Sequence, residues 1–153
     1  MNAPQAPQPT ALKLTDTIKS LVNNALTAGK PMGFAYVDDH GTPNLSYRGS
    51  VLAYSDTQLA LWARNPEGGL VKAIGSHPEV ALLYGDIAPP KSFLTFRGHG
   101  RIDSTESVRR RVYDEPPELE RNADKDRKGV AIIIDLKSVH GLVAGERLQM
   151  VAK

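Results

Sequence analysis

The feature that most constrains the fold of this chain is a series of short apolar runs separated by clusters of turn-forming residues. The clusters are rich in Asp, Gly, Pro and Asn, as in DDHGTP at 38–43 and NPEGG at 65–69. Short runs between such clusters are typical of β-strands joined by turns. We therefore predict a mainly β protein of the α+β type, a small antiparallel barrel with helices outside.

The expected elements follow from periodicity and turn signals. Apolar residues spaced three to four apart predict a helix over 15–28, which ends at Gly29. Strands are expected at 33–37, 44–53, 58–64, 79–86, 91–103, 130–136 and, more briefly, 147–151, with shorter helices at 70–76 and 104–114. The first three strands would pair in meander order. Because long helices do not alternate with the strands, a Rossmann sheet is not expected.

Two glycines inside the long strand at 91–103 predict a bend or bulge. Gly98-His99-Gly100 also forms a G-x-G sequence, but Asp103 stands where a third glycine would complete a dinucleotide-binding motif. Barrel curvature is the better interpretation of these glycines.

Length and composition indicate one domain. Of 153 residues, 1–11 are rich in Pro and Gln and are expected to be a disordered arm, which leaves 12–153 as the folded domain. No cysteine is present, so disulfides, thiolate metal sites and cysteine nucleophiles are excluded. The formal net charge of +2 and the mixing of acidic with basic residues do not predict nucleic-acid binding. Without a long apolar run or a secretory signal, a cytoplasmic protein that does not span the membrane is expected.

The histidines and serines give no catalytic or metal-binding pattern. His40, His77, His99 and His140 lack the close spacings of metal ligands, and no G-x-S-x-G motif is present. We therefore predict no metal site and assign no catalytic side chain.

Two other segments predict an anion site. Arg48 falls within an expected strand beside Gly49, and Gly68-Gly69 precedes a helix that carries Lys72. Backbone N–H groups at such a helix start, together with Arg48 and Arg64, would favour a phosphate, and Trp62 would offer an aromatic surface. The alternative is that both arginines are surface residues, the glycines form a turn and Trp62 belongs to the core.

Four segments in order resemble the pyridoxamine 5′-phosphate oxidase-like family, the FMN-binding split barrels. They are TAGKPMGFAYVDDHGTPNLSYRGSVL, LALWARNPEGGLVKAIGSHPEVALLYGD, FLTFRGHGRI and KGVAIIIDLKSVHGL, and the similarity extends from about Thr15 to Arg147. The resemblance implies a split β-barrel and a homodimer with FMN at the subunit interface.

The resemblance also implies the residues that would hold FMN. Arg48 matches the arginine that meets the phosphate, with Gly49, Ser50 and Val51 along the flavin edge; Trp62 and Ala63 match the flavin-lining strand end; Gly69, Leu70 and Lys72 match the rest of the phosphate site. The oxidases have Ser-Arg-Lys where this chain has Gly68-Gly69-Leu70, and we expect Arg64 and Lys72 to compensate for the lost charge.

The C-terminal segment, which matches the substrate-binding part of the oxidases, differs from them further. Their Arg-Leu-His-Asp-Arg signature is represented here by Arg147-Leu148-Gln149-Met150-Val151, so only Arg147 remains as a substrate-binding candidate. We therefore expect a small-molecule substrate or electron donor other than pyridoxamine phosphate.

Three further functions stay open at this point. The chain could bind flavin without turnover, as a storage protein or redox sensor. It could bind haem through His99 or His140, because related split barrels handle haem. It could also use a deazaflavin instead of FMN, since the same fold serves that cofactor.

Overall fold

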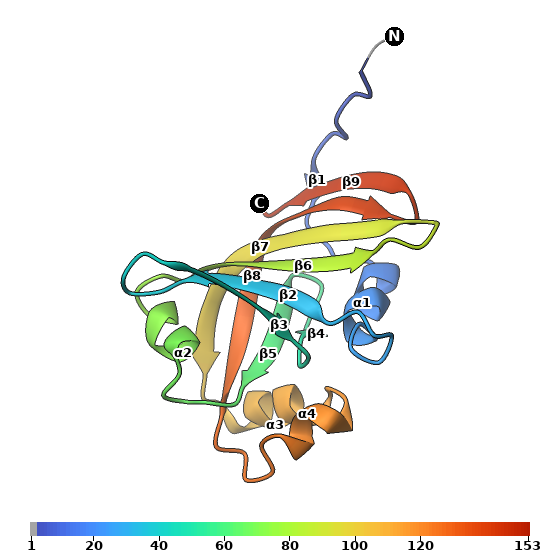
Figure 1. The fold of residues 1–153 in the computed structure, drawn as a ribbon. Coiled ribbons are helices and arrows are strands. Elements are labelled where there is room, and N and C mark those ends of the chain that lie inside the picture. The colour runs from blue at the N-terminus through green and yellow to red at the C-terminus, as the bar shows by residue number, and fades with distance from the viewer. Residues whose placement is uncertain (1–2) are drawn as a thin grey trace.

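Nine strands and four helices make up the part of the chain that the structure describes, and their order is shown in Figure 1. The computed structural model describes residues 3–153. The strands are β1 (Thr10–Ala11), β2 (Met32–Val37), β3 (Pro43–Arg48), β4 (Leu52–Ala53), β5 (Gln58–Ala63), β6 (Glu79–Asp86), β7 (Ser92–Asp103), β8 (Val130–Val143) and β9 (Glu146–Val151). The helices are α1 (Asp16–Asn23), α2 (Gly69–Ile74), α3 (Glu106–Asp114) and α4 (Glu118–Asn122).

All the strands belong to one bent sheet. Its order is β1-β9-β8-β7-β6-β2-β3, while β5 pairs with both β8 and β4. Every pair is antiparallel except β1 with β9, so the sheet is mixed, and it does not close on itself. The predicted class, a mainly β fold with helices beside it, is confirmed. In Figure 1, α1, α2 and the α3–α4 pair lie around the sheet at separate places.

The bulge predicted in β7 is confirmed. The pairing of β7 with β8 shifts register between Arg97 and Gly98. A Cβ on Gly98 would lie 2.5 Å from the backbone oxygen of Asp135, which explains why this position is a glycine. The bulge bends β7 and β8 together over the core.

The expectation of one strand over 44–53 is wrong. β3 ends at Arg48 and pairs with β2, whereas β4 begins at Leu52 and pairs with β5. The meander order is therefore also wrong, because β5 pairs with β4 and β8 rather than with β3. The turn between β3 and β4 moves the chain from one part of the sheet to another. The sequence does not indicate this turn, because strand-forming residues continue through it.

Three other elements differ from expectation. β8 extends well past the apolar run at 130–136, because its second half pairs with β7 on one side and β9 on the other. The charged segment after α3 contains the short helix α4, which the sequence pattern did not indicate. Helix α1 is shorter than the predicted 15–28, and turns carry the chain on to Gly29, whose φ is +74°.

The N-terminal strand β1 pairs with the C-terminal strand β9. Residues 1 and 2 of the predicted arm lie outside the described residues. Thr10 and Ala11 pair with Met150 and Val151, so the last part of the arm lies on the sheet edge. Residues 3–9 extend away from the body of the fold (Figure 1).

Side chains of β5 and β8 alternate between two cores. Leu59, Leu61, Ile132 and Ile134 join the main core, which α1 and α2 also enter. The intervening residues face α3 and form a second core of Leu52, Ala60, Trp62, Val112, Tyr113, Ala131 and Ile133. This alternation is that of strands buried on both faces. None of the helices in the described part of the chain is long and apolar enough to cross a membrane.

Candidate functional site

Arg48 stands at the end of β3 with its guanidinium turned toward the inner side of the sheet. It lies opposite Met32, which is buried, and directly opposed residues share a face. The guanidinium carbon is 5.7 Å from the ring centre of Phe34. The Nε atom is buried and has no hydrogen-bond partner among the residues that the structure describes. A half-buried cation is thus left with an unused donor.

The electrostatic surroundings of Arg48 favour an added anion. Burial lowers the pKa of the Arg48 guanidinium from its usual value, and the charge of Arg64 lowers that pKa further, while Tyr36 and Glu120 act in the opposite direction. Two cations, Arg48 and Arg64, therefore act on each other at the end of β3. An anion bound at Arg48 would offset both the desolvation cost and the repulsion.

Tyr36 connects this place with the start of α2. A Cβ on Gly69 would lie 2.9 Å from the Tyr36 hydroxyl oxygen, so the glycine leaves room for the phenol. Tyr36 follows Phe34 by two residues on β2 and shares its face of the sheet. The hydroxyl therefore stands among the groups that surround Arg48.

Glu120 of α4 lies against Gly49. A side chain at Gly49 would overlap the Glu120 carboxyl group and touch Leu26, so a substitution there would have to displace these two side chains. Within residues 3–153, Glu120 and Arg48 form no ion pair at 4.0 Å or less. The carboxylate acts on the guanidinium from nearby without neutralising it by direct contact.

Four of the residues predicted to line the flavin have structural roles in this chain. The Ser50 hydroxyl is buried, donates to the backbone oxygen of Trp62 at 3.2 Å and accepts from its N–H at 3.1 Å. The Trp62 ring is 5% exposed and lies edge-on to Tyr113 in the second core. Val51 and Ala63 are buried in the main core. The aromatic surface expected of Trp62 thus faces α3.

The remaining predicted residues are spread more widely. Leu70 is buried in the core, and Lys72 is exposed on α2. Arg147 is exposed on β9, which lies near one end of the strand order while β3 lies at the other. The structure thus places Gly49 beside Arg48, lets the charge of Arg64 act on the Arg48 guanidinium, sets Gly69 against the Tyr36 hydroxyl, and leaves Arg147 elsewhere. No three Asp, Glu or His side chains form a metal-binding group in the described part of the chain.

Sequence reasoning missed Tyr36 and Glu120. Tyr36 could have been found, because Met32, Phe34 and Tyr36 alternate along one strand and share the face onto which Arg48 points. Glu120 belongs to a charged segment without periodicity, and no local signal connects it with Gly49.

Several solved structures share this fold. HupZ of Group A Streptococcus is 19% identical over 88% of this chain and 98% of its own, with a TM-score of 0.63. A candidate pyridoxamine 5′-phosphate oxidase of Lactobacillus delbrueckii is 16% identical over 86% of this chain and 96% of its own, with a TM-score of 0.60. General stress protein 26 of Bacillus anthracis is 14% identical over 86% of this chain and 98% of its own, with a TM-score of 0.59.

The fold expected from the sequence resemblance is confirmed by these likenesses. No protein-family model and no curated protein matches the chain. At such low identity the likeness establishes the fold alone.

Proposed function

We propose that this chain, which has the fold of the pyridoxamine 5′-phosphate oxidase-like proteins, binds FMN and is a small oxidoreductase. The observation that carries the proposal is the buried Nε atom of Arg48, which has no hydrogen-bond partner in the described residues. Buried donors in folded proteins are nearly always paired, so an unpaired one on a cation indicates a missing acceptor.

A phosphate group is the acceptor that fits the unpaired Arg48 donor best. A guanidinium offers five N–H donors in a planar fork that matches the oxygens of a phosphate. The second cation, Arg64, and the Tyr36 hydroxyl act on the same place. A dianion there would meet two positive charges and one hydroxyl donor, with Glu120 as the opposing charge.

The other predicted cofactor residues divide by role. Gly49 and Gly69 leave room for Glu120 and Tyr36, which border the site, and Lys72 would add charge from α2. Ser50, Val51, Trp62, Ala63 and Leu70 would hold the backbone in place, since their side chains are already buried or hydrogen-bonded. When bound, FMN supplies the electron-transfer chemistry, and the chain binds and orients it. We assign no catalytic side chain, and the substrate or electron donor remains a small molecule other than pyridoxamine phosphate.

The second copy implied by the resemblance has a suitable surface. Leu45, Tyr47 and Leu83 are 80%, 77% and 53% exposed. Gly33 lies between Tyr47 on β3 and Leu83 on β6, so these side chains border a hollow of about 590 Å³ with little covering it. An exposed apolar face of this kind favours an interface, and we propose that it pairs with the same face of a second chain.

A binding protein without turnover is the second candidate function. The observation that favours it is at the end of β9, where Gln149 and Val151 replace the His and Arg of the oxidase signature. Reduction of the bound flavin by NADH or NADPH, followed by multiple turnovers with an acceptor, would distinguish an enzyme from a storage or sensor protein.

The experiment that tests cofactor binding is the visible spectrum of the purified protein, with mass analysis of whatever heat releases. Absorption near ~370 and ~450 nm and a released mass equal to FMN are expected. A single band near ~420 nm would indicate a deazaflavin or haem instead. A colourless protein that does not take up added FMN would contradict the proposal.

A further inference from the structure

We infer that the outer face of the sheet carries a second ligand site, which binds a small organic anion between Arg97 and Arg147. These arginines and His140 line a hollow of about 520 Å³ over β7, β8 and β9. The site is separate from Arg48, which stands at the other end of the strand order. The inference therefore does not depend on flavin binding.

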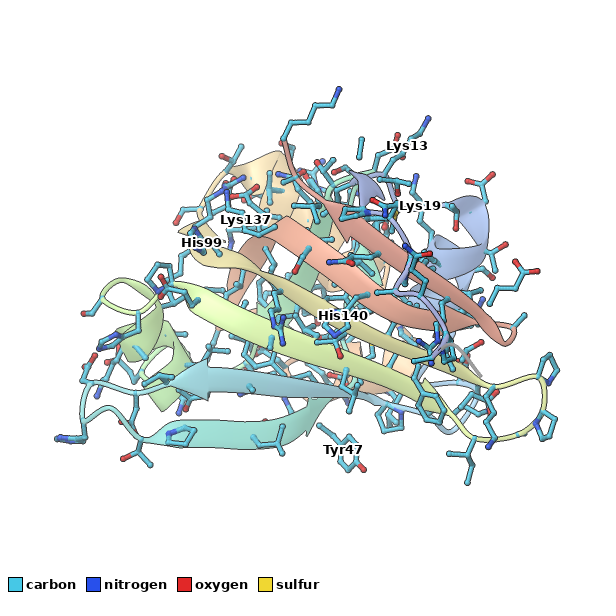
Figure 2. The ribbon with its side chains drawn as sticks, turned by 90° about the horizontal axis from the view of Figure 1, so that it is seen from above. Lys13, Lys19, Tyr47, His99, Lys137 and His140 are labelled. Atoms are coloured by element: carbon cyan, nitrogen blue, oxygen red, sulfur yellow. The ribbon has the colours of Figure 1, made fainter. Side chains whose placement is uncertain are left out.

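Strand register brings these side chains onto one face. Val139 is fully buried, so its neighbours Ser138 and His140 point outward along β8. Arg97 on β7 lies opposite Ser138 on β8. On the other side of β8, Gln149 of β9 lies opposite His140, and Arg147 of β9 lies opposite Leu142. Because opposed residues share a face, the two arginines stand on either side of His140, one on each neighbouring strand. Figure 2, which looks onto the sheet from above, shows His140 on this side of the strands.

The charges of this hollow are unbalanced. Its lining contains two arginines and a histidine but no Asp or Glu. Neither arginine takes part in an ion pair within residues 3–153. Two unpaired guanidinium groups that border one hollow are a suitable pair of donors for a carboxylate or phosphate.

Arg101 on the same strand provides an internal comparison. It follows Arg97 on β7, yet its guanidinium binds Asp103 at 3.1 Å and Asp135 at 2.9 Å. His99, between the two, lies 3.9 Å from Glu79. Within residues 3–153, the cations at that end of β7 thus have carboxylate partners, whereas Arg97 and Arg147 form no ion pair at 4.0 Å or less.

The rest of the lining indicates the class of ligand. Leu142 provides apolar surface, Pro7 of the arm lines one side of the hollow, and Gln149 contributes an amide. Apolar surface with a few convergent polar groups is typical of small-molecule sites. A small molecule with an apolar body and an acidic group fits this lining better than a long polyanion, which would need a more extended basic surface.

The test is a titration of the purified protein with phenyl phosphate, followed by backbone amide NMR. We expect saturable shifts at the amides of Gly141, Leu142 and Leu148, and none with phenol, which lacks the charge. Arg97→Gln and Arg147→Gln should each weaken this binding by about tenfold or more, the effect of losing a charge-assisted hydrogen bond. Arg110→Gln on α3 is the matched control, since its ion pair with Glu106 is exposed and contributes little.

Arg48→Gln separates the two sites. If the outer-face site exists, phenyl phosphate still shifts the Gly141 amide in that variant with unchanged affinity. Shifts confined to Gly49 and Gly69 would overturn the inference, as would equal affinity for phenyl phosphate in the wild type, Arg97→Gln and Arg147→Gln. Because the readout is by residue, failure of the flavin proposal would leave this result unaffected.

Discussion

The indole nitrogen of Trp62 donates a 2.8 Å hydrogen bond to Oδ2 of Asp124, which joins β5 to the loop that follows α4. The same carboxylate accepts from the backbone N–H groups of Gly129 at 2.9 Å and Lys128 at 3.0 Å. The Trp62 ring packs edge-on against Tyr113, with 5.1 Å between the ring centres. Trp62 and Asp124 thus hold the α3–α4 segment, which carries Glu120, against the sheet.

Replacing Asp124 by Asn should destabilise the protein. The amide keeps one acceptor but turns an NH₂ group toward one of the three donors, so a half-buried hydrogen bond is lost. We expect the free energy of unfolding in urea to fall by about 1–3 kcal/mol at neutral pH. Asp126→Asn, an exposed neighbour in the same loop, is the control and should leave stability unchanged.

The effect of Asp124→Asn should depend on pH. Burial acts to raise the pKa of Asp124, but hydrogen bonds from Trp62, Gly129 and Lys128 outweigh it and hold the pKa below the ordinary value of 3.8. A carboxyl whose pKa is lowered by folding stabilises the protein above 3.8 and ceases to do so as the pH falls through its folded pKa. The stability gap between wild type and variant should therefore be full at pH 7 and shrink at acid pH; a constant gap would contradict this account.

Gly98→Ala should be among the glycine-to-alanine substitutions that lower the free energy of unfolding most in this chain. The new Cβ would lie 2.5 Å from the Asp135 backbone oxygen and 2.9 Å from Ile134 Cγ2, and the backbone cannot yield without moving the bulge. We expect a loss of about 1–3 kcal/mol in unfolding free energy. Gly75→Ala is the control, because nothing lies within 4 Å of the added methyl group there. Equal stability of the two variants would refute the proposed role of the bulge.

The exposed apolar face formed by Leu45, Tyr47 and Leu83 should make the chain dimeric. Light scattering is expected to give twice the chain mass of 16.6 kDa, about 33 kDa. Leu83→Lys places a charge on this face and should yield a monomer. Ile87→Lys changes an equally apolar residue, 78% exposed beyond the end of β6, and should remain dimeric. A wild type that is monomeric at micromolar concentration would remove the proposed interface.

Local patterns predicted those parts of the fold that depend on local interactions. The bulge at Gly98 and the strand at 79–86 needed only residue types and turn signals. The break between β3 and β4 could not be predicted in this way, because both segments favour strands and their separation depends on distant partners, β2 and β5. Helix α4 lacks an apolar face and is held by contacts that the sequence does not reveal.

The same distinction holds for the candidate site. Arg48 could be identified from its place in a strand beside a glycine. Its most informative property, a buried nitrogen without a partner, depends on how β2, α2 and α4 meet, and only the folded chain shows it. For Trp62, the alternation along β5 decides between a ligand surface and a core residue, and it directs the ring to the core.

The most direct test of the central claim compares FMN with riboflavin, which lacks the phosphate, by equilibrium titration of the flavin-free protein. If Arg48 binds the phosphate, the wild type prefers FMN, and Arg48→Gln weakens FMN binding by about 1.5–3 kcal/mol while leaving riboflavin binding nearly unchanged. Arg110→Gln should behave as the wild type does. Equal affinity of the wild type for FMN and riboflavin, or an undiminished preference for FMN in Arg48→Gln, would contradict the assignment of Arg48.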